Sequence, residues 1–595
     1  MKIVVIDSGL NLNSPLAQRQ SFHGGIEIYE DEEGTILYKE KEVDDIGHGT
    51  AVASYIDMLV EDAEIIPLKV MSNEKMASCN VLCEAFEYIT KHIDCDIVNI
   101  SAGIVSCDDI FRLEECCRQL TEKGTVIVAA YDNGGAISYP AAFDCVIGVD
   151  GARVKQRAGY YDKVEGKNAD YVGCITEKRL FTLDGYEICA GNSFLAPEFV
   201  AKVAKLKRDG AKTYQEVVEQ LNNGAGSVVS RRIYENHNIP FEMGKAIVFP
   251  FNKEMHSLAR FEDLLSFEVV GYYDVKYSKI TGKKVSDVCC IEGNEKVVGN
   301  IESLAWDDSF DTVILGHTSI ISSTTRKDYE RMIIELCKKH GKKLFSCRDI
   351  RDNGSLLEGM IYYCPYVDYR YMPQFHKMHV MGCPVVGVVG TGGSQGKFTM
   401  QLGIRKHLLK EGYKVAQLGT EPTAQLFGMD CVYPMGHESA VYIKGFDAVF
   451  ELNCMMGYLQ SKDPDIILFG SQSNSVPYHV GGPQDYPVVQ HELLLGCQAD
   501  GYILCVSDDA NTEYIKRTIS YLEGIYTSKV IAIVLSHFSV GYRFSTISGE
   551  KDFKTEEEMK KWGKELYHEF GIPVFSSADE NYCEALSNEI VTYFS

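Results

Sequence analysis

The sequence predicts an α/β fold in which parallel sheets are covered by helices. In the first part of the chain, short apolar runs typical of buried strands cover residues 2–7, 63–70, 96–101 and 125–130. Between two of these runs, residues 80–93 place apolar side chains at helical spacing. Strands and helices that alternate along a chain pack as a parallel sheet between helices, so we expect this arrangement throughout the protein.

Two later blocks repeat the alternation. We expect a first domain at residues 1–210, a polar helical connector at 211–240, a second α/β domain at 241–380 and a third at 381–595. A chain of 595 residues fits this organisation at ordinary domain size. The strands expected in the later blocks are FEVVGYYD, TVILGH, KKLFSC, CPVVGVVG, YKVAQLGT, PDIILFG, GYILCVS and KVIAIVLS.

Composition limits the partners and the environment of the protein. The formal net charge of −25 disfavours nucleic acid, whose phosphates attract basic surfaces, and is compatible with a neutral or basic peptide. No apolar run reaches the roughly 18 residues of a membrane span, and the N-terminus shows no signal peptide. We therefore expect a cytoplasmic protein that binds no membrane and whose 20 Cys are mostly reduced. A homo-oligomer is left open.

An acid, a histidine and a serine lie on three separate elements of the first domain. Asp7 ends the first strand, His48 stands between two glycines before a helical segment, and Ser193 begins a late helix. Ser193 could attack a carbonyl, His48 could take its proton, and Asp7 could orient the imidazole. Taken singly, each residue is also compatible with a loop or helix-capping role.

The motifs around these residues resemble those of the subtilisin-like serine proteases, in that family's order, over roughly residues 1–205. The resemblance implies a catalytic triad of Asp7, His48 and Ser193. It also implies a substrate cleft lined by residues 101–103, where a peptide pairs as an extra strand. The motifs are VVIDSGL, GHGTAVAS, VNISAG, SYPAAFDCVIGVD and GNSFLAP, and the cleft residues are Ser101, Ala102 and Gly103.

Two positions depart from that family's pattern. Asn192 stands where a Thr usually precedes the Ser, and the oxyanion segment is VAAYDNGG. Either Asp132 or Asn133 therefore occupies the oxyanion position. An amide there would donate a hydrogen bond to the developing charge, whereas a carboxylate would repel it, and losing such a donor costs about 3 kcal/mol. The sequence thus allows a slow, selective protease or a domain that only holds a peptide.

No metal site is expected from ligand spacing. The Cys residues lack the paired CxxC spacing of structural zinc sites. In HKMH, His376 and His379 are interpreted as polar loop residues before a strand rather than as ligands. Asp44 and Asp45 are interpreted as solvated loop acids.

A glycine-rich turn between a strand and a helix opens the third domain. Successive backbone N–H groups in such a turn cradle phosphates, and a lysine at its end reaches the terminal phosphates. Phe398 occupies the slot where Ser or Thr usually binds magnesium, and an ordinary strand-to-helix turn is the alternative. The candidate nucleotide-binding residues are Gly390, Gly392, Gly393, Ser394, Gln395, Gly396, Lys397 and Thr399.

Residues 240–595 resemble the DgcN-like P-loop proteins, which join a Rossmann-like domain to a P-loop domain related to dethiobiotin synthetase. The matching motifs include VGTGGSQGKFT, LGTEPTAQLFGMD and PDIILFGSQSNSVPYH. The resemblance implies ATP and Mg²⁺ as cofactors, with one group of members linked to N-acylation of D-glutamate. Gly470 and Ser471 stand where the family often has a Glu, so Glu451 or Asp465 is considered as a substitute.

This domain order resembles clostridial peptide maturation system proteins. It implies a ribosomally made precursor peptide as substrate. Our first hypothesis is therefore an intracellular serine endopeptidase that processes such a peptide and carries an ATP-binding module. The alternative is an ATP-dependent enzyme that modifies a peptide or amino acid and uses its protease-like domain for recognition, and a third is a non-catalytic peptide scaffold.

Overall fold

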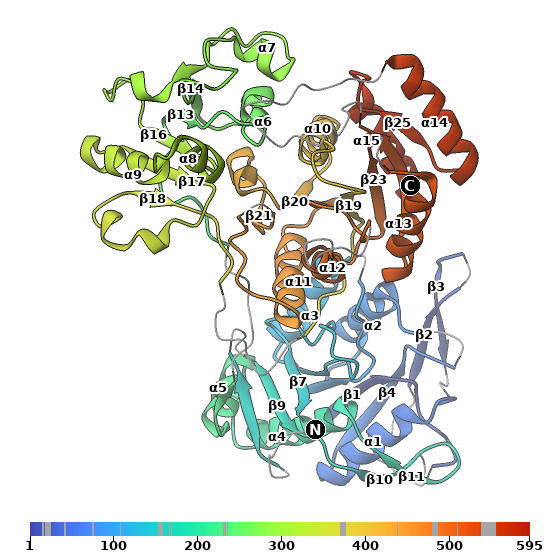
Figure 1. Ribbon diagram of the computed structural model, residues 1–595. Coiled ribbons are helices and arrows are strands. Elements are labelled where there is room, and N and C mark those ends of the chain that lie inside the picture. The colour runs from blue at the N-terminus through green and yellow to red at the C-terminus, as the bar shows by residue number, and fades with distance from the viewer. Residues whose placement is uncertain are drawn as a thin grey trace. The chain divides into compact units, whose positions relative to one another are not determined.

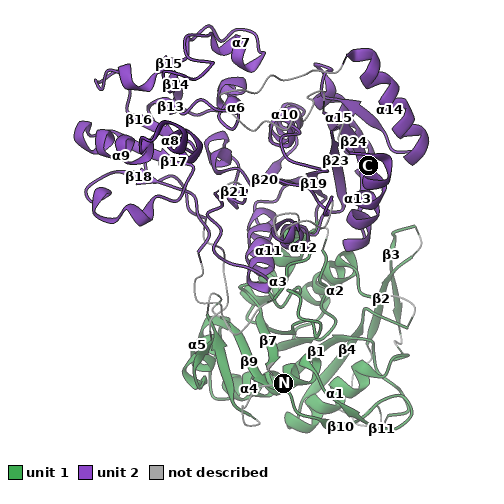
Figure 2. Ribbon diagram, viewed as in Figure 1, with its two compact units in different colours: residues 1–233, 371–382 green, residues 234–370, 383–595 purple. Residues whose placement is uncertain are grey.

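The computed structural model contains two compact units, which Figure 2 shows in different colours. One unit comprises residues 1–233 and 371–382, and the other comprises residues 234–370 and 383–595. Both units are α/β and built on mostly parallel sheets, which confirms the predicted fold class. The structure describes the whole chain except residues 15–16, 18–24, 32, 41–42, 74–75, 108, 153–158, 166, 168, 230–233, 235, 369–376, 437, 479–485, 508–509 and 537–554.

The first unit contains a long sheet, a separate hairpin and five described helices (Figure 1). Its strands are β1 (Lys2–Asp7), β2 (Ile26–Glu30), β3 (Ile36–Glu40), β4 (Glu64–Lys69), β5 (Ile97–Ile100), β6 (Val126–Ala130), β7 (Ile147–Ala152), β8 (Tyr161–Val164), β9 (Asp170–Cys174), β10 (Lys178–Phe181), β11 (Tyr186–Cys189) and β12 (Val228–Val229). Its helices are α1 (His48–Leu59), α2 (Cys79–His92), α3 (Ile110–Glu122), α4 (Asn192–Arg208) and α5 (Tyr214–Gly224). The sheet order is β12-β8-β9-β7-β6-β5-β1-β4-β2-β3, and β10 pairs with β11.

Strand β1 lies inside this sheet and is covered on both faces. It pairs in parallel with β4 on one side and β5 on the other. Ile3 and Val5 pack in a buried cluster with residues of α1, α4 and α5, whereas Val4 and Ile6 pack with residues of α2 and α3. Such two-sided burial explains why the strand is continuously apolar until Asp7.

The structure divides the chain differently from the predicted boundaries. Helix α5 falls in the predicted connector, yet Val217, Val218 and Leu221 are buried in the cluster that also holds α4. Residues 371–382, predicted within the second α/β domain, also group with the first unit. The apolar face of α5 explains the first difference, because burying it requires docking on the sheet.

The second unit contains two sheets. The strands of one are β13 (Lys245–Phe249), β14 (Glu268–Asp274), β15 (Gly299–Asn300), β16 (Thr312–Leu315), β17 (Lys343–Ser346) and β18 (Tyr362–Tyr363), in the order β15-β14-β13-β16-β17-β18. The strands of the other are β19 (Val385–Gly390), β20 (Val415–Gly419), β21 (Cys431–Val432), β22 (Ile466–Gly470), β23 (Gly501–Val506), β24 (Lys529–Leu535) and β25 (Val574–Ser576), in the order β21-β20-β22-β19-β23-β24-β25.

Helices accompany both sheets of the second unit. They are α6 (His256–Arg260), α7 (Val285–Cys289), α8 (Ser319–Thr325), α9 (Tyr329–His340), α10 (Lys397–Lys410), α11 (Phe446–Gln460), α12 (Val488–Cys497), α13 (Thr512–Ile525), α14 (Glu556–Phe570) and α15 (Tyr582–Phe594). Short 3₁₀ turns cover Glu262–Leu264, Ile301–Ser303, Arg351–Leu356 and Pro422–Phe427. The part of the chain that the structure describes holds no helix both long and apolar enough to cross a membrane.

One buried cluster joins the two sheets of the second unit. Phe251 and Met255, which follow β13, pack in the same cluster as Leu402 of α10 and Phe427 of the 3₁₀ turn after β20. The two predicted α/β domains are therefore joined by a common hydrophobic cluster rather than by a polar linker. This cluster fixes the residues after β13 beside the start of α10.

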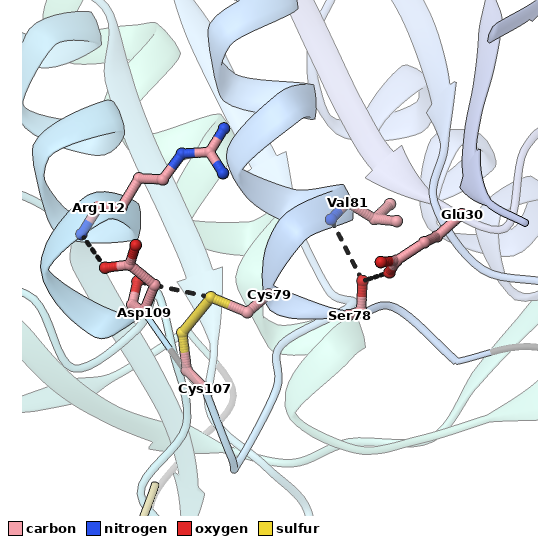
Figure 3. Close-up of a disulfide and its surroundings, with 7 residues drawn as sticks. All are labelled: Glu30, Ser78, Cys79, Val81, Cys107, Asp109 and Arg112. Carbon is pink, nitrogen blue, oxygen red and sulfur yellow. Dashed lines mark hydrogen bonds between the residues drawn. A yellow bond between two sulfur atoms is a disulfide. The ribbon is translucent and has the colours of Figure 1, made fainter. Parts of the chain in front are cut away.

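A disulfide joins two segments of the first unit. Cys79, the first residue of α2, is bonded to Cys107, which follows the predicted cleft residues (Figure 3). The Cys79 Sγ atom lies 3.5 Å from the Asp109 backbone carbonyl oxygen, and Ser78 caps α2 by accepting from the N–H of Val81. The remaining cysteines are free thiols, as expected for most of them.

Candidate active site and phosphate-binding loop

Asp7 and His48 are hydrogen-bonded at the carboxyl end of β1. The Asp7 Oδ1 atom lies 2.8 Å from Nδ1 of His48, which is the first residue of α1. Asp7 is 1% exposed, and its Oδ1 also accepts from the backbone N–H of Ser8. Burial lowers the pKa of His48, but the charge and hydrogen bond of Asp7 raise it, and the net direction is upward.

Asp44 holds the turn that presents His48. This carboxylate accepts from the backbone N–H groups of Gly47 and Thr50 and from the hydroxyls of Ser8 and Thr50. It is 3% exposed, so its interpretation as a solvated loop acid is wrong. Burial of a carboxylate is tolerated here because several donors surround it.

Glycines permit the close approach of this turn to β1. Gly47 has φ of 88°, and a Cβ atom at Gly49 would lie 2.4 Å from the carbonyl oxygen of Gly9. Neither position therefore accepts a larger residue without displacement of the backbone. The GHG motif is thus required by packing as well as by the position of His48.

Ser193 lies in the first turn of α4, beside the His48 helix. It is 6% exposed, and α4 packs against α1 and against β5, β6 and β7. The ring of the next residue, Phe194, is 5.4 Å from the His48 ring. The Ser193 hydroxyl makes no hydrogen bond to another described residue, whereas its carbonyl accepts from Ser101 at 3.4 Å. The three predicted triad residues therefore converge on one region of the first unit.

The geometry distinguishes Asn133 from Asp132. The Asn133 Oδ1 atom accepts from the backbone N–H of Asn192 at 2.9 Å, immediately before Ser193. Asp132 instead turns into its own loop, where Oδ2 accepts from the N–H of Ala136 at 3.3 Å. A backbone N–H can only donate, so the amide oxygen of Asn133 must face it and the amide NH₂ remains available as a donor.

Asn192, the residue that departs from the subtilisin pattern, ties this region together. Its buried side-chain NH₂ donates to the Tyr131 carbonyl at 2.9 Å and to Asp150 Oδ1 at 2.8 Å. A threonine has no second donor hydrogen for such a bridge. The substitution therefore gains a connection between the end of β6, the strand β7 and the start of α4.

The predicted cleft residues continue from the end of β5. Among the described residues, none hydrogen-bonds with the backbone groups of Ala102 or Gly103, although Ile104 pairs with Tyr139. A Cβ atom at Gly103 would lie 3.3 Å from the Tyr139 carbonyl. An unpaired backbone edge beside Ser193 is suited to an extended peptide.

The glycine-rich turn runs from Gly390, at the end of β19, to Lys397, at the start of α10. Gly396 and Ser394 have positive φ angles of 80° and 59°, which bend the chain between strand and helix. A Cβ atom at Gly390 would lie 2.3 Å from Gln395 Oε1, so the backbone is crowded here. Gly392, Gly393 and Ser394 form the outer part of the turn.

Two side chains fold back into this turn. Lys397 donates to the Gly392 carbonyl at 2.6 Å and is 5% exposed, and burial lowers its pKa to about 8. Gln395 donates to the hydroxyls of Thr391 and Ser507 and accepts from the N–H of Gly392. Lys397 thus stays inside the loop, next to the amides that a phosphate would contact.

The residues after Lys397 serve different roles. Phe398 packs against Phe427, with ring centroids 5.8 Å apart, so the usual magnesium position has become part of the shared core. Thr399 lies half-buried on the first turn of α10, two residues after Lys397.

The comparisons with known proteins match two separate stretches of the chain. Residues 1–228 match the subtilase family, and residues 376–584 match the DUF1611 P-loop domain, a domain of unknown function. This confirms the predicted fusion of a subtilisin-like domain with a P-loop domain. No curated protein matches the chain.

Solved structures resemble one half or the other. A DUF1611 family protein from Anabaena variabilis has 15% identity and a TM-score of 0.42, covering 59% of this chain and 100% of that chain. A lanthipeptide protease has 17% identity and a TM-score of 0.30, covering 37% and 78%. The epidermin leader peptide processing serine protease of Staphylococcus aureus has 15% identity and a TM-score of 0.30, covering 37% and 68%.

An acid of the P-loop domain that sequence reasoning missed is Glu421, which directly follows the strand β20 and Thr420. Burial raises its pKa, and Gln472 and Lys397 are among the groups that oppose this shift. The two proposed substitutes are placed elsewhere: Asp465 accepts from the N–H of Lys414 at the opposite end of β22, and Glu451 lies in α11. The sequence signal that could have indicated Glu421 is its position directly after the strand-like run in LGTEPT.

A pocket of about 380 Å³, part of it open to solvent, lies near the P-loop domain's turn. It is lined by Pro250, Asn252, Glu254, Asp274, His317, Ser319, Ile320 and Ile321. The neighbouring Lys253 donates to Ser394 at 2.8 Å. Burial lowers the pKa of His317, but Glu438 and Glu254 raise it overall, and burial raises the pKa of Asp274 to about 6.

The structure gives no candidate metal site within the described ranges. No group of three or more His, Cys, Asp or Glu residues among them is arranged to hold a metal ion. His376 lies outside the described residues, so its predicted role as a loop residue is not addressed.

Substituting the two oxyanion candidates separately distinguishes their roles. We expect Asn133→Ala to lower kcat for peptide cleavage about a hundredfold with little change in KM, because a donor to the transition state is lost. Asp132→Ala should change kcat much less, because this side chain contacts its own loop. Steady-state kinetics of both variants check this, and a larger loss in Asp132→Ala would contradict it.

Proposed function

We propose that the chain is a serine endopeptidase that processes a ribosomally made precursor peptide. The observation that carries the proposal is the buried Asp7–His48 hydrogen bond beside Ser193, with Asn133 bonded to the residue before the serine. The unpaired backbone of Ala102 and Gly103 supports an extended peptide substrate. The choice of a precursor peptide is supported by the resemblance in domain order.

In the proposed reaction each residue has one task. Asp7 binds Nδ1 of His48, which leaves Nε2 to take the proton from the Ser193 hydroxyl. The serine oxygen then forms a bond to the peptide carbonyl carbon, and the carbonyl oxygen gains negative charge. The Asn133 NH₂ and the amides at the start of α4 would stabilise that charge. His48 finally gives its proton to the leaving amine, and water releases the acyl group.

We further propose that the P-loop domain binds ATP with Mg²⁺. The loop fits a phosphate chain, because Lys397 lies in the turn and Gly392 to Ser394 line its outer part. Lys397 and the loop amides would hold the phosphates, and Thr399 and Glu421 would hold the metal. Bound ATP would supply a phosphoryl group to an acceptor.

An alternative is a peptide- or amino-acid-modifying enzyme that uses this ATP. The observation that favours it is the pocket next to the loop, which carries the carboxylates Glu254 and Asp274 and the imidazole of His317. In this alternative the subtilase domain would bind the peptide without cutting it. Mass spectrometry of the precursor peptide, with and without ATP, separates the two: a shorter peptide supports proteolysis, and a mass addition that requires ATP supports modification.

A fluorophosphonate probe tests the protease proposal directly. We expect the full chain to be labelled at Ser193, because His48 activates this hydroxyl, and Ser193→Ala to remain unlabelled. Tandem mass spectrometry locates the adduct. A folded wild-type chain that shows no adduct would refute the proposed activity.

The pH dependence of labelling follows from the Asp7–His48 pair. His48 must be neutral to take a proton, and its pKa is raised above 6.5, so the rate should rise with pH with a midpoint above that value. Asp7→Asn removes the charge that raises the pKa, so the midpoint should fall and the rate should drop by orders of magnitude. A midpoint that does not move in this variant would contradict the assignment.

Nucleotide binding is tested at Lys397. We expect Lys397→Met to weaken ATP binding about ten- to a hundredfold, because a charged donor to phosphate is lost. Isothermal titration calorimetry measures this, with Lys410→Met as the control because Lys410 is exposed at the far end of the same helix. Equal affinity in both variants would exclude phosphate binding by this loop.

A further inference from the structure

The protease unit includes a short segment from far along the chain. Residues 377–382 lie with the first unit, although they directly precede the P-loop strand β19. The Met378 carbonyl accepts from the N–H of Ile137 at 2.7 Å, and its N–H donates to the Gly135 carbonyl at 3.2 Å. The segment therefore pairs with the loop that carries Asn133.

The same segment places a cation in the interior. The Lys377 ammonium lies 2.6 Å from Asp150 Oδ2, and the two residues are 8% and 4% exposed. Among the described residues, Lys377 provides the only polar contact to this oxygen, because Asn192 and Gly151 donate to Oδ1. Removing the ammonium would leave a buried carboxylate without its counter-charge, which is strongly destabilising at such a site.

Asp150 connects this ion pair to the residues around Ser193. Its Oδ1 binds the side-chain NH₂ of Asn192, which also binds the Tyr131 carbonyl at the end of β6. The backbone N–H of Asn192 binds Asn133. The Lys377 ammonium also lies 5.0 Å from the centre of the Tyr131 ring. The contacts therefore form a continuous chain from Lys377 to residues 131–138, here called the oxyanion loop.

We propose that Lys377 is a positioning residue for the protease, holding the oxyanion loop and the start of α4 through Asp150 and Asn192. This inference rests on the proposed protease function. Lys377 lies outside the stretch that matches the subtilase family, residues 1–228. Lys377 falls instead at the start of the stretch that matches the P-loop domain, residues 376–584. A chain ending near residue 233 would therefore lack this contact.

The test uses full-length variants and two measurements. We expect Lys377→Met to slow fluorophosphonate labelling of Ser193 about tenfold or more, because small displacements of reacting groups cost this much. It should also speed hydrogen exchange in residues 131–138. Lys377→Arg, which keeps the charge, should stay within about threefold of wild type in labelling.

Rescue separates charge neutralisation from simple packing. Adding Asp150→Asn to Lys377→Met removes the unpaired charge while keeping an oxygen that accepts from Asn192, so labelling should recover most of the loss. Lys207→Met is the matched control. This lysine is half-buried at the end of α4 and donates to the Gly124 carbonyl, away from the loop, so its labelling rate should be unchanged.

Each result has a clear meaning. Wild-type rates of labelling and exchange in folded Lys377→Met would overturn the inference, as would a folded double variant that stays as slow as the single one. If Lys377→Met does not fold, the double variant and Lys377→Arg decide in its place. If the wild type is not labelled at all, the protease proposal fails, and hydrogen exchange alone then shows whether Lys377 holds the loop.

Discussion

The buried carboxylate of Asp7 at the end of β1 makes the hydrogen bond on which the candidate protease site depends. Its hydrogen bond to His48 requires a strand that ends and a helix that begins at the same edge of the sheet. A parallel sheet provides this, because its strands end at one edge and the helices that follow them begin at that edge and run back to the other. The P-loop follows the same rule: Gly390 ends β19, which lies between β22 and β23 where the strand order reverses.

Three buried carboxylates near Ser193 are stabilised in three different ways. Asp44 is surrounded by backbone and hydroxyl donors, Asp150 is paired with Lys377, and Asp7 binds His48 while its second oxygen has no hydrogen-bond partner among the described residues. Only in the third arrangement is the carboxylate paired with an imidazole, so that its negative charge stabilises the protonated form of His48. A cation facing Asp7 instead of a histidine would satisfy the charge but could not accept a proton from Ser193.

The sequence predicted the fold class, the central strands β1, β4, β5 and β6 of the first unit and the convergence of Asp7, His48 and Ser193, because these depend on local patterns and on motifs in chain order. It did not predict β2, β3 or β7 to β12, which are less continuously apolar. It left Asp132 and Asn133 undecided, since adjacent residues of a loop differ in direction only once the loop is folded. Lys377 could not be found either. Its partner Asp150 is more than two hundred residues away. Asp150 ends the motif SYPAAFDCVIGVD and Lys377 lies within HKMH, but nothing in either stretch indicates that the two side chains meet. The burial of Asp44 likewise depends on hydrogen bonds to Ser8, Gly47 and Thr50 that composition does not reveal.

The Gln401 side chain occupies the space beside Gly470, the position where the DgcN-like family often has a Glu. A Cβ atom at this position would lie 1.7 Å from Gln401 Nε2, so no acidic residue could stand there while Gln401 keeps its place. The neighbouring strand β20 supplies Glu421 at its own carboxyl end, where Gln472 and Lys397 are among its neighbours. Because adjacent parallel strands end at the same edge of the sheet, Glu421 supplies a carboxylate near the loop even though Gly470 supplies none.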